Sequence, residues 1–213
     1  MRIQPFQIGP YGTMCYAVYE GNRCVLIDAP FPLSKALSFI KDSGLNLEAI
    51  YLTHGHFDHI FGLAEARKAY KALPIYIGEE DLSFITGGYE RTIELLKAFD
   101  PLFLNRYASP LIGEMPDDFI TYGSTVPWFS VIKTPGHTSG SVSLYSEKEG
   151  IVFTGDTLFY QSVGRTDLDG NQKELLESLK KLSKLDPETL VFPGHGGATK
   201  IGTETKFNPY FRF

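Results

Sequence analysis

The sequence predicts a layered α/β fold within one domain that spans residues 1–213. Segments with strand character alternate with amphipathic segments along most of the chain, which is the order expected of helices packed on β-sheets. No internal repeat, low-complexity tract or linker separates these segments. Hydrophobic residues make up 43% of the chain and charged residues 21%, a composition that can fill one sizeable core.

The first half of the chain is expected to contain a hairpin followed by two strand–helix units. The hairpin turns at Gly21 and Asn22, and a helix at 33–44 places its apolar residues on one face and ends at Gly44. Apolar and β-branched runs predict the strands. The expected elements are strands at 14–20, 23–29, 49–54 and 73–78, and helices at 33–44 and 60–73.

Residues 79–121 contain a glycine pair and several prolines that interrupt any periodicity. We expect this segment to be irregular cover over a site, with one helix at 91–99, and its part in shaping a substrate cleft stays open. Regular structure then resumes. The remaining expected elements are strands at 126–135, 141–147, 150–156 and 188–196, and an amphipathic helix at 172–185.

The charge of the chain argues against a nucleic-acid partner. The formal net charge is -5, and the nearest basic group consists of Lys180, Lys181 and Lys184. These lysines lie on a predicted helix beside Glu174 and Glu177, so a solvated helix face accounts for them. We therefore expect a small-molecule substrate and no nucleic acid.

Hydropathy argues against a membrane partner. No run of about 18 apolar residues occurs, and the first residues lack the apolar stretch of a signal peptide. We expect a cytoplasmic protein, either a monomer or a small homo-oligomer. Cys15 and Cys24 flank the hairpin turn and are expected to be small apolar residues in strands rather than a disulfide.

All five histidines follow predicted strands, in loops that carry Gly or Pro. Three of them stand close together in LTHGHFDHIFG, residues 52–62, and the others follow later strands in TPGH and PGHG. An aspartate in FTGD has the same placement. The residues that share this pattern are His54, His56, Asp58, His59, His137, Asp156 and His195.

Imidazole nitrogen and carboxylate oxygen are the usual ligands of hydrolytic zinc. In His54-x-His56 the alternation places both side chains on one side of an extended segment, while Asp58 and His59 can face a second ion. A single histidine is usually a surface residue or a hydrogen-bonded core residue. That explanation does not account for four ligand-type residues within six positions, so the sequence predicts a metal site.

These motifs resemble those of the metallo-β-lactamase superfamily of hydrolases. HGHFDH (54–59) matches the HxHxDH signature, and TPGHTSGS (134–141), FTGDTLF (153–159) and FPGHG (192–196) match the later metal motifs. The likeness covers nearly the whole chain and is weakest in residues 79–121. It implies a four-layer αββα sandwich, with the metal site at one edge of the two sheets.

The resemblance also implies a complete binuclear site. His54, His56 and His137 would hold the first metal; Asp58, His59 and His195 would hold the second, with Asp156 bridging both. The implied cofactors are two divalent ions, zinc in the first place, with iron or manganese as alternatives. A metal-bridged hydroxide would be the nucleophile, and Asp58 would orient it as a metal ligand, so no side chain need attack the substrate.

Within the superfamily the chain looks closest to the single-domain glyoxalase II-like group, which hydrolyses S-2-hydroxyacylglutathione thioesters. The run GRTD (164–167) is typical of that group, and no separate C-terminal helical glutathione-binding domain is expected after His195. Arg165 stands where larger relatives carry a lysine that binds the glutathione carboxylate. A structural salt bridge of Arg165 with Asp167 or Asp169 is the alternative.

Four alternative functions are consistent with this signature. A mononuclear iron persulfide dioxygenase of the same fold would use His56, His137 and Asp156, although FPGHG argues against it, because such enzymes tend to carry Pro-Ala-His there. A phosphodiesterase or a lactonase would use the binuclear site, but the acidic charge disfavours a phosphodiesterase that acts on nucleic acid. A non-catalytic metal-binding module is disfavoured because every ligand position is filled.

Overall fold

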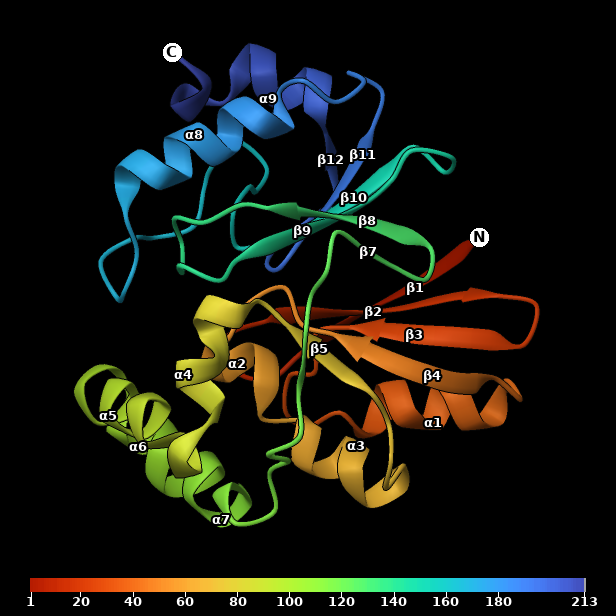
Figure 1. Ribbon diagram of the computed structural model, residues 1–213, viewed down its shortest axis with the longest axis vertical. Coiled ribbons are helices and arrows are strands. Elements are labelled where there is room, and N and C mark those ends of the chain that lie inside the picture. The colour runs from red at the N-terminus through yellow and green to blue at the C-terminus, as the bar shows by residue number, and fades with distance from the viewer. Residues whose placement is uncertain (213) are drawn as a thin grey trace.

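The computed structural model describes residues 1–212, apart from the side chains of residues 107, 109 and 110. Two six-stranded sheets pack face to face, and helices cover both outer faces (Figure 1). This is the αββα sandwich that the resemblance implies. Among residues 1–212, no helix is long and apolar enough to cross a membrane.

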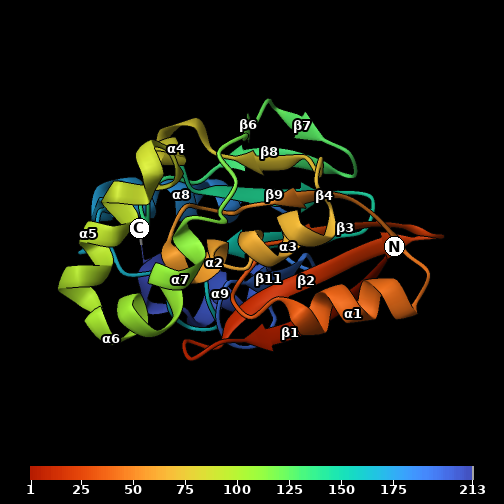
Figure 2. The same ribbon diagram turned by 90° about the horizontal axis from the view of Figure 1, so that it is seen from below.

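The first sheet has the order β1-β2-β3-β4-β5-β6. The strands β1, β2 and β3 pair antiparallel, and β3 through β6 pair parallel. The strands are β1 (Arg2–Ile8), β2 (Thr13–Glu20), β3 (Arg23–Ile27), β4 (Asn46–Tyr51), β5 (Ile75–Ile77) and β6 (Ile120–Thr121). Helices α1 (Ser34–Asp42), α2 (Phe57–Ile60) and α3 (Leu63–Ala69) lie against its outer face (Figure 2).

The second sheet has the order β12-β11-β10-β9-β8-β7, with β10 and β11 parallel and the other neighbours antiparallel. Its strands are β7 (Thr125–Val126), β8 (Phe129–Lys133), β9 (Val142–Ser146), β10 (Ile151–Gly155), β11 (Leu190–Pro193) and β12 (Thr199–Lys200). Its outer face is covered by α8 (Gln172–Leu182), α9 (Ile201–Phe207) and the turn η4 (Pro209–Phe211).

The alternation of side chains explains why the central strands are apolar on every residue. In β3, Cys24 and Leu26 pack toward the helices, whereas Val25 and Ile27 pack toward the second sheet. Successive strand residues point to opposite faces, so a strand covered on both sides must be apolar throughout. Phe153 of β10 meets these residues from the second sheet and is fully buried.

The prediction of irregular cover for residues 79–121 is wrong in part. The segment forms short helical turns, and its glycines and prolines stand at their boundaries; Pro101, for example, begins α6. The helix predicted at 91–99 is confirmed as α5. The elements are η1 (Glu79–Asp81), α4 (Leu82–Ile85), η2 (Gly87–Tyr89), α5 (Glu90–Phe99), α6 (Pro101–Phe103), the π-helical η3 (Leu104–Ala108) and α7 (Ser109–Ile112).

Two other predicted elements are divided. The helix predicted at 60–73 is broken at Gly62, whose N–H bonds to the carbonyl of Ala29 and whose position leaves no room for a Cβ, 2.4 Å from the carbonyl oxygen of Pro30. The strand predicted at 126–135 is the hairpin β7–β8, which turns through Trp128 with φ of 76°. In addition, β1, β12 and α9 were not predicted.

Candidate metal centre

Four strands end at the same edge of the sandwich, and each delivers ligand-type side chains in the loop that follows. The loop after β4 carries His54 and His56, and α2, which begins directly after this loop, carries Asp58 and His59. The loops after β8, β10 and β11 carry His137, Asp156 and His195 respectively. The structure therefore brings together, from both sheets, all seven residues that the sequence singles out.

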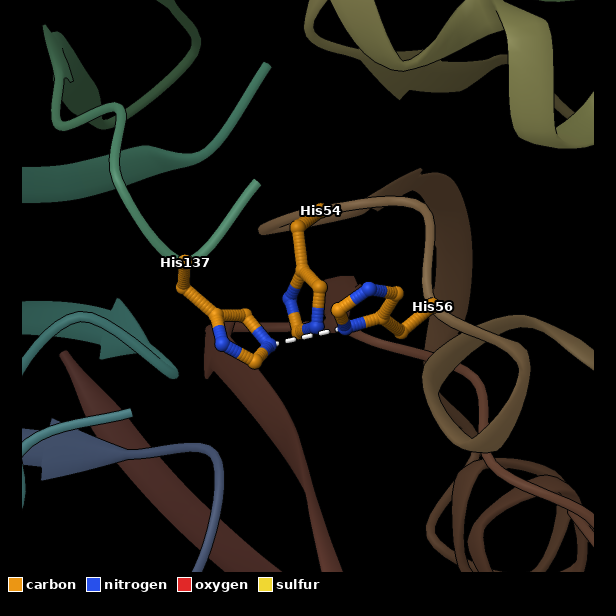
Figure 3. A group of neighbouring side chains, drawn as sticks. All are labelled: His54, His56 and His137. Atoms are coloured by element: carbon orange, nitrogen blue, oxygen red, sulfur yellow. Dashed lines mark hydrogen bonds between the residues drawn. The ribbon is translucent and has the colours of Figure 1, made fainter. Parts of the chain in front are cut away.

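The first group of neighbouring ligand atoms belongs to His54, His56 and His137 (Figure 3). One potential ligand atom from each residue lies within 4.8 Å of the other two. Nδ1 of His56 lies 2.8 Å from Nε2 of His137. Two imidazole nitrogens at this separation require a proton or a cation between them, because two lone pairs repel each other.

The second group consists of Asp58, His59 and His195. Oδ2 of Asp58 lies 3.3 Å from Nε2 of His195 and 3.6 Å from Nε2 of His59. Asp156 stands between the two groups. Its Oδ1 is 3.4 Å from Nε2 of His59, and its Oδ2 is 3.5 Å from Nε2 of both His137 and His195.

Unsatisfied polar atoms show that this cluster fits metal ions. In the described part of the chain, five buried side-chain nitrogen or oxygen atoms lack a hydrogen-bond partner, and four belong to the cluster. They are Nε2 of His54, His56 and His59 and Oδ1 of Asp156. Because a buried polar atom without a partner is costly, a cation that takes these lone pairs is the natural partner. The donor set of nitrogen and oxygen suits zinc, iron or manganese.

Four of the five imidazole rings are held by hydrogen bonds on the nitrogen that faces away from the cluster. Nδ1 of His59 contacts the carboxylate of Asp28 at 2.8 Å, and Nδ1 of His54 contacts Oγ1 of Thr53 at 3.0 Å. Two backbone carbonyls serve two more rings: the carbonyl of Arg165 lies 2.7 Å from Nδ1 of His137, and that of Tyr11 lies 3.2 Å from Nδ1 of His195. Such partners fix ring orientation and leave Nε2 for a metal.

Burial keeps two of the imidazoles neutral. Burial lowers the pKa of His54 well below its usual value, and the neighbouring imidazoles lower it further. Burial, aided by His137, lowers the pKa of His56 to about 3. A neutral imidazole has a free lone pair, so both rings are in the state that binds a metal.

The carboxylates dominate at the second group. Burial alone would lower the pKa of His59, but the charges of Asp58 and the other nearby carboxylates outweigh it and raise that pKa. Burial alone would raise the pKa of Asp58, yet His59 and His195 hold it well below its usual value. The pKa of Asp156 is lowered in the same way, because the nearby histidines outweigh its burial. The carboxylates are therefore ionised and attract cations, whether protons or metals.

A pocket of about 330 Å³ opens over the cluster. Four aromatic residues line it: Tyr11, Phe57, Phe99 and Phe159. Phe57 and Phe99 pack together with ring centroids 6.0 Å apart, and the hydroxyl of Tyr11 donates to Asp100. An apolar wall with ligand-type groups on its floor is the usual form of a small-molecule site.

Arg165 lies at this pocket and has two partners. Its guanidinium donates to Asp167 through Nε and Nη2, both at 2.6 Å, and its Cζ lies 5.1 Å above the ring of Phe99. Asp169, the other suggested partner, pairs with Arg91 instead. The salt bridge with Asp167 is thus present, and Arg165 still lines the pocket.

Sequence reasoning missed the buried aspartates that hold the ligand loops. Asp28 accepts hydrogen bonds from the backbone and hydroxyl of Thr53 at 2.7 and 2.8 Å as well as contacting His59. Asp81 contacts both the 54–59 loop and the loop after β8. Neither residue belongs to a ligand motif, and the available signal was only the rarity of buried aspartate.

The fold and the cluster together define an αββα protein with a histidine–aspartate metal centre at the strand ends. Residues 8–195 match the family described as "Metallo-beta-lactamase superfamily". The "Probable metallo-hydrolase YqgX" of Bacillus subtilis is 32% identical over 217 residues, which cover 99% of this chain and 97% of the relative. The "Hydroxyacylglutathione hydrolase GloC" of Haemophilus influenzae is 28% identical over 219 residues, covering 99% and 98%.

Solved structures agree with these relatives. BLEG-1, described as a B3 metallo-beta-lactamase, superposes with a TM-score of 0.83 at 31% identity, and the match covers all of both chains. TTHA1623 in a di-iron-bound form gives 0.80 at 36% identity, covering 97% of this chain and 99% of its own. ETHE1 from Myxococcus xanthus gives 0.73 at 26% identity, covering 98% and 84%. The chain belongs to the metallo-beta-lactamase superfamily, a family of metal-dependent hydrolases.

Proposed function

We propose that this protein is a binuclear metal-dependent hydrolase of small acyl thioesters, S-2-hydroxyacylglutathione or a related compound. The observation that carries the proposal is that seven ligand-type residues lie beside an aromatic pocket, which has one cationic side chain at its wall. The name of the Haemophilus influenzae relative supports the same substrate class. In this proposal Asp156, which lies between the two groups of ligands, and Asp58 of the second group would be among the residues that hold the ions.

A pair of divalent ions, when bound, would lower the pKa of water and polarise the carbonyl of the thioester. The chain supplies the remaining requirements. Neutral His54 and His56 present lone pairs, and ionised Asp58, which also accepts a hydrogen bond from Thr13 at 2.7 Å, is fixed in orientation. Tyr11 and the phenylalanine rings shield the acyl group from bulk water.

Arg165 is proposed to bind a carboxylate of the thiol part of the substrate, in exchange for Asp167. Its planar donor fork suits a carboxylate, and its partner is exposed enough to move away. Replacing Arg165 by Ala should raise KM about tenfold for thioesters that carry a carboxylate. The kcat for neutral thioesters should stay unchanged, and an equal loss for both substrate classes would contradict this role.

The proposal is tested by metal analysis together with a substrate panel. Zinc-loaded protein should hydrolyse acyl thioesters faster than a lactone, a phosphodiester or a β-lactam, the last included because BLEG-1 is described as a B3 metallo-beta-lactamase. The variant His56→Ala should lose both metal and turnover. Absence of turnover on every thioester, with hydrolysis of another class, would reject the substrate assignment, and full activity of His56→Ala would reject the site.

Iron is the specific alternative to zinc as the bound metal, because the 36% identical TTHA1623 has a structure in a di-iron-bound form. A mononuclear iron dioxygenase would use His56, His137 and Asp156 and would consume oxygen with a persulfide. One iron per chain with oxygen uptake, and no thioester turnover, would favour that function over hydrolysis.

A further inference from the structure

Asp81 is a buried carboxylate outside the ligand motifs. It ends η1, directly before α4, in the segment that connects β5 of the first sheet to the short helices. Its side chain is fully shielded from solvent. A buried aspartate persists only when its oxygens are well supplied with donors, so those donors indicate what it holds in place.

The donors come from both ligand loops. Oδ2 of Asp81 accepts from the backbone N–H of Gly55, between His54 and His56, at 2.8 Å. The same oxygen accepts from Oγ1 of Thr138 at 2.7 Å, and Oδ1 accepts from the backbone N–H of Gly140 at 2.7 Å. Gly55 follows β4 of the first sheet, whereas Thr138 and Gly140 follow β8 of the second. One carboxylate therefore joins loops from two different sheets.

Close backbone approach surrounds this carboxylate. A Cβ at Gly140 would stand 2.6 Å from Oδ1 of Asp81, and one at Gly78 would stand 2.0 Å from the carbonyl oxygen of Gly140. A Cβ at Gly55 would meet the ring of Phe84 at 2.8 Å. The segment from 78 to 84 therefore packs tightly against both loops, which leaves neither loop space to shift toward it.

The loops that Asp81 joins carry the three histidines of the first group. His54 and His56 flank Gly55, and His137 precedes Thr138, so displacement of either contact moves a ligand (Figure 3). We propose that Asp81 is a positioning residue that sets the separation of the 54–56 loop and the 137–140 loop, and thereby the affinity of the metal site formed by His54, His56 and His137. The inference rests on the metal centre of the proposed function but not on its thioester substrate.

The test compares Asp81→Asn with a matched variant in the same full-length protein. Glu204 is also fully buried and also accepts three hydrogen bonds, from Thr199 at 2.6 Å and from Gln161 and Asn208 at 2.8 Å. It touches neither ligand loop through these bonds. Glu204→Gln therefore controls for the loss of a buried charge and of its hydrogen bonds.

Metal-stripped proteins are titrated with zinc against a chromophoric chelator, and cadmium NMR distinguishes the ion at His54, His56 and His137, which supply three imidazoles, from the ion at Asp58, His59 and His195, which supply two. Asp81→Asn should weaken the three-imidazole ion by about 10- to 100-fold and the other ion by less than about threefold. Glu204→Gln should leave both affinities near those of the unaltered protein. Urea unfolding of the metal-free variants measures their stability separately.

Wild-type affinity for both ions in Asp81→Asn would overturn the inference, as would an equal loss in Glu204→Gln. If Asp81→Asn does not fold, Thr138→Val removes a single donor while keeping the side-chain shape, and it should weaken the three-imidazole ion by about threefold to tenfold. No change in Thr138→Val would then overturn the inference. Thioester turnover is measured apart, so intact zinc binding without turnover would reject only the proposed reaction.

Discussion

Asp28→Asn tests how far the second group of ligands depends on a residue that binds no metal itself. Asp28 is buried and holds Thr53 through two hydrogen bonds and His59 through a third. Its φ is 60°, a left-handed conformation that asparagine also tolerates, so the exchange alters charge and one donor–acceptor pairing rather than the backbone.

The magnitude follows from the three contacts. The amide oxygen can stay on the side that serves both the Thr53 hydroxyl and His59, which turns the new NH₂ toward the backbone N–H of Thr53. That lost bond and its unpaired donor cost about 1–3 kcal/mol, and the change from a charged to a neutral acceptor costs about 1 kcal/mol more. We expect metal-free Asp28→Asn to lose about 2–4 kcal/mol of unfolding free energy.

Metal binding should change at one ion more than at the other. Because Asp28 orients His59, zinc affinity of the group of Asp58, His59 and His195 should fall about 10- to 100-fold, while the three-imidazole ion loses less. Chelator competition and cadmium NMR measure this, with Glu204→Gln as the control for the loss of a buried carboxylate that accepts three hydrogen bonds. Affinity of both ions within threefold of the unaltered protein, despite a lower unfolding free energy, would refute the reasoning.

Three further predictions concern the pocket, the pH dependence and the thiols. Asp167→Asn should free the guanidinium of Arg165 and lower KM for carboxylate-bearing thioesters, by at most about fivefold because the pair is exposed; an increase in KM would contradict this. Zinc affinity should keep rising above pH 6.5, because the surrounding carboxylates raise the pKa of His59 and a proton must leave this ring before it can bind the metal. Chelator competition between pH 6 and 9 measures this affinity, and a plateau below pH 6.5 would count against the prediction. Burial raises the pKa of Cys24 to about 12 and also raises the pKa of Cys15 well above its usual value, so a thiol reagent at pH 8 should label neither residue in the native protein and both in denaturant.

Most of the fold could be predicted because the central strands are covered on both faces and read as continuous apolar runs. The edge strand β1 was not predicted, since most of its residues are partly exposed and Pro5 interrupts its pattern. Apart from α5, the short helices between 79 and 112 are not predicted, because the same residues that break a long helix also mark the ends of short ones. Gly88, with φ of 72° between α4 and α5, is one such boundary.

The ligand cluster could be predicted because its chemistry is local in sequence, immediately after each strand. The buried aspartates that hold the ligand loops in place, Asp28 and Asp81, could not be predicted. Asp81 meets Gly55 across 26 positions and Gly140 across 59, and Asp28 meets Thr53 across 25. No spacing rule relates an isolated aspartate to donors that far away, and only packing of the two sheets brings them together. Tertiary structure likewise decides whether Arg165 pairs with Asp167 or Asp169, because Asp169 forms its salt bridge with Arg91.

The pocket and the metal centre use different atoms of the same residues. Arg165 and Tyr11 line the pocket with their side chains, while their backbone carbonyls orient His137 and His195. A backbone carbonyl is retained whichever side chain a residue carries. The side chains at these two positions can therefore be exchanged, and substrate recognition altered, without removing the hydrogen bonds that orient the metal ligands. The adjacent Gly164 has no such freedom. A Cβ there would lie 1.8 Å from the carbonyl oxygen of Asp156 and 3.0 Å from Nδ1 of His137, so any side chain would press directly on the site. In the run GRTD, the metal centre therefore requires glycine at position 164, whereas the side chain at position 165 can differ with the substrate.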